Sequence, residues 1–108
     1  MNLSITEIQQ ELQKGFDHLD KFVQKPCFVS PEYHTAGCEA RTAMKATLAM
    51  SNEVEILKSL YKIKDTWHGI LNGLLADPDY LEYRKICQML RVRLQSQVLL
   101  RQNFPHGF

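Results

Sequence analysis

The most constraining feature of this sequence is a run of apolar residues at helical spacing, placed directly after a start signal for a helix. Ser4 and Glu7 form a Ser-x-x-Glu capping box, in which the hydroxyl accepts from an unpaired backbone amide and the carboxylate reaches back to the cap. A seam of apolar residues follows, and Gly15 occupies the one position of its repeat that has no apolar side chain. The seam consists of Ile5, Ile8, Leu12, Leu19 and Phe22. Because such a seam packs along another helix, we expect a helix over about 3–24.

A second helix is predicted over about 31–50. The first helix ends before Pro26, because a residue that precedes proline is pushed out of the α region. Ser30 as the N-cap and Pro31 at the first helical position then begin the second helix, and Thr35 is an alternative start. Small residues dominate the inner face of this helix, which indicates tight packing. The inner face consists of Ala36, Ala40, Ala43 and Thr47, and it ends at Met50.

The third predicted helix runs from about 52 to 76 and is the most apolar of the set. Asn52 is its plausible cap, and Glu53 suits the positive end of a helix. Its expected seam is Ile56, Leu60, Ile63, Trp67, Ile70 and Leu74. Since Ser51-Asn52 is a weak stop, one continuous helix through 31–76 is the alternative, and we favour a break.

A strong start signal, Asp77-Pro78-Asp79, precedes the fourth predicted helix, over about 78–103. Its expected apolar positions are Leu81, Ile86, Met89, Leu90, Leu94, Val98 and Leu99. These patterns predict an all-α fold, a four-helix antiparallel bundle, or three long helices if the second and third are continuous. We expect one helical domain over 1–108, a length that can bury a core without disulfides or metals.

Three cysteines make an odd count, which is not a disulfide framework. From the first residues and the short apolar runs we expect neither a signal peptide nor a membrane-spanning segment. Reduced cytoplasm is therefore the expected location. Cys27, His34 and Cys38 lie within twelve residues, but they lack the paired spacing of a zinc site. Cys38 and His34 are one helical turn apart, yet nothing supplies a third group or an oxyanion hole. We expect His68 to be packed or half-exposed rather than catalytic, and we predict no metal, no cofactor and no enzymatic activity.

The basic stretch near the C-terminus is the best candidate for an interaction surface. Residues 83–108 contain five basic side chains and no acid, in a chain whose net charge is only +1. The aromatic tail adds apolar groups that no predicted helix buries. The candidate partner-binding residues are Arg84, Lys85, Arg91, Arg93, Arg101, Phe104 and Phe108.

The sequence therefore predicts a non-catalytic protein–protein interaction module, such as a small adaptor, chaperone or inhibitor of a larger protein. The regular seams also make a homodimer plausible. The alternative is a nucleic-acid-binding regulator that grips phosphates with the basic helix. The modest pI of about 7.7 and the long helices argue against the alternative.

Overall fold

The computed structural model describes residues 2–25 and 30–103, and within them the chain is all-α, with no strand. The elements are α1 (Ile5–Gln24), α2 (Pro31–Leu48), α3 (Glu53–Ile63), the π-helix η1 (Lys64–His68), α4 (Gly69–Leu71), the 3-10 helix η2 (Asn72–Leu74) and α5 (Pro78–Asn103). Because α3, η1, α4 and η2 follow one another without interruption, they form one long helical arm.

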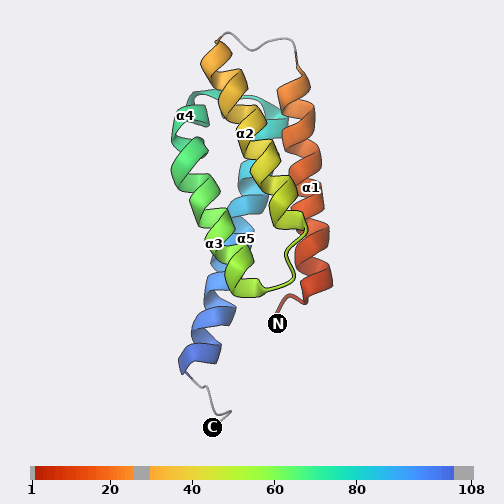
Figure 1. Cartoon of the computed structure of the whole chain (residues 1–108), viewed down its shortest axis with the longest axis vertical. Helices are drawn as coiled ribbons and strands as arrows, with labels where there is room; N and C mark the ends of the chain where they lie inside the picture. Colours follow the sequence, from red (N-terminus) through yellow and green to blue (C-terminus); the bar gives the residue numbers. More distant parts are fainter. Residues whose placement is uncertain (1, 26–29, 104–108) are drawn as a thin grey trace.

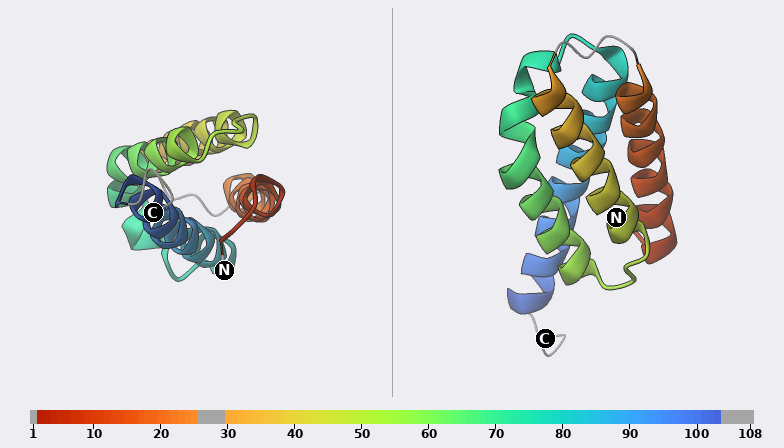
Figure 2. Two further views of the ribbon diagram at one scale, coloured as in Figure 1. Left: turned by 90° about the horizontal axis from the view of Figure 1, so that it is seen from below. Right: turned by 45° about the horizontal axis from the view of Figure 1, so that its top comes forward.

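The four arms form an antiparallel bundle measuring 54 × 22 × 22 Å (Figure 1). α1 packs on α2 and α5, and α3 packs on α2 and α5, so each arm contacts two neighbours around a square. The end-on view in Figure 2 shows α2 and α3 on one side, with α5 opposite them. The last turns of α5 extend beyond the ends of the other helices (Figure 1).

The predicted helix starts are confirmed by their capping contacts. Both bonds of the capping box at Ser4 are present, and Ser30 accepts from the amide of Glu32, so the alternative start at Thr35 is wrong. Asn52 accepts from two amides of α3. The chain leaves the helix between α2 and α3, which confirms the break and makes the alternative of three long helices wrong. Asp77 caps α5 through its Oδ1, which accepts from two backbone amides.

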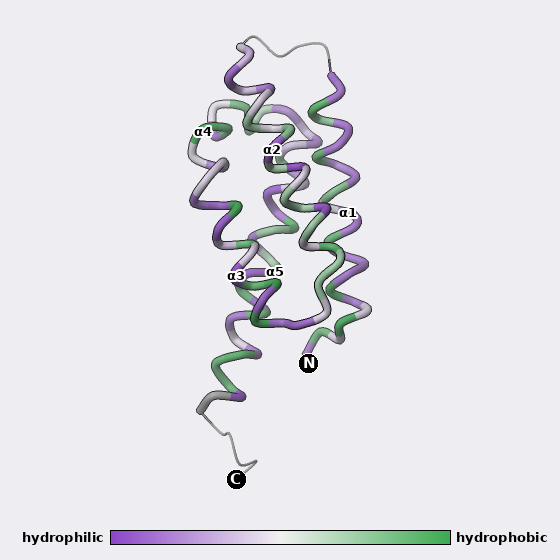
Figure 3. The backbone as a smooth tube through the Cα atoms, viewed as in Figure 1, coloured by the Kyte–Doolittle hydropathy of each residue, from purple (hydrophilic) through white to green (hydrophobic). Residues whose placement is uncertain are grey.

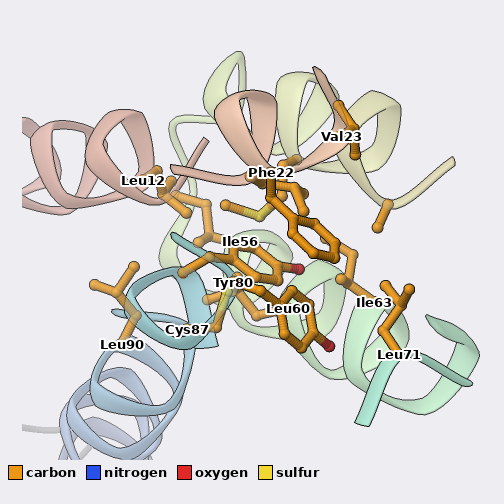
Figure 4. Packing of buried hydrophobic residues seen from close by; sticks show 14 of the residues in the cluster. Leu12, Phe22, Val23, Ile56, Leu60, Ile63, Leu71, Tyr80, Cys87 and Leu90 are labelled. Carbon is orange, nitrogen blue, oxygen red and sulfur yellow. The ribbon is translucent and has the colours of Figure 1, made fainter. Parts of the chain in front are cut away.

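Buried side chains from all four arms meet along the bundle axis, as Figure 4 shows for the region around Tyr80. α1 contributes its predicted seam from Ile8 to Phe22, and the small face of α2 is buried at Ala36 and Ala40. Burial of each large aliphatic side chain stabilises the fold by roughly 1.5–3 kcal/mol. None of the described helices combines the length and the apolar character that crossing a bilayer would require.

The buried face of α5 differs from the predicted one. Leu81 and Leu99 are exposed, whereas two tyrosines and a cysteine that were not counted as core residues are fully buried. The buried seam of α5 is Tyr80, Tyr83, Cys87, Leu90 and Leu94, spaced 3, 4, 3, 4. Aromatic rings dominate the N-terminal part of this seam, where the Tyr80 ring centroid lies 4.8 Å from that of Phe22.

The π-helix η1 changes the register of the third arm. Ile63 is buried as predicted, but the next buried residue is His68, five positions on, and Leu71 follows. Because a π turn accommodates one extra residue, everything after it is rotated relative to the seam that precedes it. Trp67 is therefore only partly buried, and Ile70, predicted to be in the seam, is 41% exposed.

Candidate interaction surface

The predicted basic residues of α5 do not form one free stripe, because several make contacts within the chain. Arg84 donates to Asn72 Oδ1 at 2.6 Å and to the Tyr80 hydroxyl at 3.2 Å. Lys85 pairs weakly with Glu82, at 3.5 Å. The Arg84 side chain is thereby held against neutral groups of η2 and α5, whereas Lys85 stays exposed beside Glu82 on the same helix.

Arg101 is paired at the other end of α5. Its Nη2 lies 2.8 Å from Glu53 Oε1, at the start of α3. Gln97 lies one turn before Arg101 and completes this junction: the Leu3 amide donates to its Oε1 at 2.6 Å. The C-terminal half of α5 is thereby fastened to the first residues of both α1 and α3.

Arg91 departs from the prediction of a surface cation. Only 7% of it is exposed, its guanidinium carbon lies 5.9 Å from the ring centroid of Tyr61, and its Nη1 has no hydrogen-bond partner in the described chain. The reason is its position on the flank of α5 that faces α3, beside the buried Leu90 and Leu94. A buried cation cannot grip an external partner, so Arg91 is not part of an accessible surface.

The outer face of α5 carries large apolar side chains instead. Val92 is 62% exposed, Leu100 52% and Leu99 48%. A shallow hollow of about 330 Å³ lies beside them and is lined by Asn2, Arg93 and Ser96 among others. We call Val92, Arg93, Ser96, Leu99 and Leu100 the outer α5 face. In Figure 3, hydrophobic positions continue along α5 below the other helices.

A buried polar cluster lies between η1 and α5. His68 Nε2 is 2.6 Å from the Tyr83 hydroxyl, and the two rings meet edge to face with centroids 5.2 Å apart. Burial, together with the smaller effect of the positive charges of Arg84, Arg91 and Lys64, lowers the pKa of His68 to about 3. The prediction that His68 packs is confirmed by its 2% exposure.

The same burial suppresses acid–base and thiol chemistry in this cluster. It raises the pKa of Cys87 to about 12 and the pKa of Tyr83 well above the usual range for a phenol. A cysteine nucleophile needs the opposite shift, because the thiolate is the reactive form. The cluster is therefore suited to holding α5 against the third arm.

The predicted cysteine–histidine neighbours are found together on α2, where Cys38 Sγ lies 3.7 Å from His34 Nε2. Cys27, the third member of that group, lies outside the described residues, as do Phe104 and Phe108. Within residues 2–25 and 30–103, no three His, Cys, Asp or Glu side chains converge in a way that could hold a metal ion.

Two features of the surface were missed by sequence reasoning. The first is the outer α5 face, because the sequence pattern places Leu99 in the buried seam and gives Val92 no role. A groove between α2 and α3 was also missed, because it depends on how two helices are spaced. Comparison of the chain with protein-family models, with curated proteins and with solved structures found no match to any of them.

Proposed function

We propose that this chain is a non-catalytic protein–protein interaction module that binds a partner protein through the outer α5 face. The observation that carries the proposal is the exposure of Val92, Leu99 and Leu100 on one helix. Clustered exposed side chains of this size are typical of interaction sites, because burying them against a partner removes apolar area from water.

The charge next to these side chains favours a partner with acidic groups around an apolar contact. Arg93 borders the apolar residues. The pKa of Glu7 on α1 is lowered mainly by the hydrogen bonds that Glu7 makes with Ser4, and in smaller part by the positive charge of Arg93. Complementary charge at the edge of an apolar contact mainly raises the association rate and the specificity. An adaptor, a chaperone or an inhibitor of a larger protein would use such a surface in the same way.

Site-specific photo-crosslinking in the cells that produce the chain tests this proposal. A benzophenone side chain at Val92 or Leu99 should capture a protein in an adduct of discrete size. The same group at Gln10, an exposed position on α1, should not capture it. The double substitution Val92→Asp/Leu100→Asp, combined with a crosslinker at Leu99, should remove the adduct.

Nuclease treatment separates this proposal from the nucleic-acid alternative. A protein adduct that survives nuclease supports the proposed function, and an adduct of twice the mass of the chain identifies the partner as a second copy. Adducts that disappear with nuclease, or equal capture at Gln10, would contradict the proposal. To test the contribution of positive charge we choose the variant Arg93→Glu rather than Arg91→Glu. A glutamate at the buried position 91 would unfold the bundle instead of reporting on binding.

A further inference from the structure

A groove of about 570 Å³ runs between α2 and α3. These two helices lie on the side of the bundle opposite α5 (Figure 2). Ala43 and Ala46 line its α2 wall, and Ile63 lines its α3 wall. Below it, the hydroxyls of Thr47 and Ser59 lie 2.6 Å apart and tie the two helices together. The groove is therefore open, mostly apolar and fixed at its base.

The length and the walls of this groove match a helix. Its lining extends along the third arm from Glu55 to Trp67, about 18 Å at 1.5 Å per residue, or roughly three helical turns. The two alanines leave room for another backbone to approach closely, and Met50 closes the groove near the start of α3. Amphipathic helices bind in such grooves through anchors three or four positions apart.

The charges along the groove are ordered. Lys58 and Lys62 are exposed and stand one turn apart on its rim, and neither is paired with a carboxylate in the described chain. Glu55 lies at the opposite end of the rim from Trp67. A complementary helix therefore carries two acids one turn apart, with a neutral or basic residue over Glu55.

Trp67 is an independent sign that this groove has a ligand. The regular seam predicts it inside the bundle, but the π turn of η1 rotates it to the end of the groove, where it is partly exposed. π turns are rare, have poorer hydrogen-bond geometry than an α-helix and occur often at functional sites. The fold thus gives up regular helix geometry at the position that places its only tryptophan at this surface.

We propose that the groove between α2 and α3 binds an acidic amphipathic helix of a partner protein, with its apolar face between the alanines and Trp67 and its acids on Lys58 and Lys62. This surface is separate from the outer α5 face, so either one can be disproved while the other stands. If the groove and the outer α5 face each bind a partner, the chain joins two partners through opposite sides of one bundle.

Fluorescence of Trp67 tests this proposal directly. The probe is a lactam-stapled helical peptide of about 18 residues, long enough for a stable helix. It has leucines at heptad spacing and two glutamates one turn apart, and the control peptide has lysines in place of the glutamates. We expect the acidic peptide to shift Trp67 emission saturably and the lysine peptide to bind at least about tenfold more weakly.

Two variants in the groove and two control variants sharpen the result. Lys58→Glu/Lys62→Glu should reverse the preference between the two peptides, whereas Lys14→Glu/Lys21→Glu, an equal charge change on α1, should leave it unchanged. Ala46→Phe fills the groove from an exposed position and should abolish the emission shift while the circular dichroism spectrum is retained. Val92→Asp, on the other surface, should bind the acidic peptide normally.

Several outcomes would overturn the proposal. They are no saturable shift with the acidic peptide, equal binding of both peptides, and unchanged binding to the Ala46→Phe variant. A dimer in sedimentation velocity that Ala46→Phe dissociates would show that a second copy occupies the groove. Sodium dodecanoate below its micellar concentration tests whether the groove binds a small amphiphile instead of a helix. A shift of Trp67 emission with dodecanoate but not with the acidic peptide would also reject a helical ligand.

Discussion

The Nε2 atom of His68 lies 2.6 Å from the hydroxyl oxygen of Tyr83, and both side chains are buried between η1 and α5. No other described group partners the remaining ring nitrogen, Nδ1. This pair therefore adds a buried polar contact between the third arm and α5, and it makes the stability of the bundle sensitive to pH and to loss of one hydroxyl.

Acidification should destabilise the protein through His68. The folded-state pKa of about 3 lies below the ordinary histidine pKa of 6.5, so between these values the unfolded chain binds a proton that the folded chain does not. Stability from this group is complete above pH 6.5 and falls as the pH drops, by up to about 1.4 kcal/mol per pH unit. Urea unfolding of the wild type and of His68→Gln at pH 7, 5.5 and 4 measures the slope, which should be flatter in the variant. Equal slopes would contradict the assignment to His68.

Tyr83→Phe should lower the free energy of unfolding by about 1–3 kcal/mol, because it leaves the buried His68 with no hydrogen-bond partner among the described residues. Tyr61→Phe is the matched control, since its hydroxyl bonds to Gln95 at the surface. The control should lose about 0.5–1.5 kcal/mol at most, the usual net value of one hydrogen bond. Chemical denaturation of both variants at pH 7 compares them, and equal losses would show that the buried pair has no special role.

Arg91→Met should raise the free energy of unfolding, by about 1–3 kcal/mol, since it removes a buried cation with an unpaired donor and keeps the packing of its stem. Arg93→Met, on the exposed neighbour, should change stability by about 0.5 kcal/mol or less. Thermal unfolding at pH 7 distinguishes the two. A clear loss of stability in Arg91→Met would mean that its contact with the Tyr61 ring outweighs the burial of its charge.

Gly15 and Gly69 form a matched pair for testing the approach of α1 to α5. A Cβ at Gly15 would meet Ile86 Cγ2 at 3.3 Å, whereas a Cβ at Gly69 would meet nothing within 4 Å. Gly69→Ala should stabilise by about 0.5–1 kcal/mol through helix propensity. Gly15→Ala should gain less than that, and Gly15→Leu should lose about 1–3 kcal/mol by overpacking. Equal gains for the two alanine variants would show that Ile86 yields freely.

The helix starts could be predicted from sequence because capping is local. Ser4, Ser30 and Asp77 each satisfy amides within three residues of themselves, and no tertiary contact is needed to place them. The break before α3 was predictable for the same reason, from Asn52. What the chain does inside a helix depends on its neighbours, and there the predictions were weaker.

The π turn could not be predicted from spacing, because a regular seam through Trp67 fits the sequence. Only packing against α5 makes burial of His68 preferable. The buried seam of α5 does have regular helical spacing, but Tyr80 and Tyr83 are not among the predicted apolar positions, although aromatic rings fill a core equally well.

The surfaces that we propose for partner binding could be predicted from the sequence only in part. The outer α5 face lies on the predicted helix and includes Arg93, but Arg101 is held by Glu53 from another arm, which no local pattern reveals. The groove beside Trp67 depends on the spacing of α2 and α3, so it appears only once the helices are packed.

The pairing of α1 with α5 has a mechanical consequence. The first residues of α1 and the last turns of α5 lie at the same end of the bundle, and Gln97 bonds to Leu3 there (Figure 1). A force that pulls the two ends of the chain apart therefore acts on that junction first. It then separates α1 from α5 one turn after another, as in unzipping, rather than shearing the whole interface at once. The bundle should therefore open at low force from its ends.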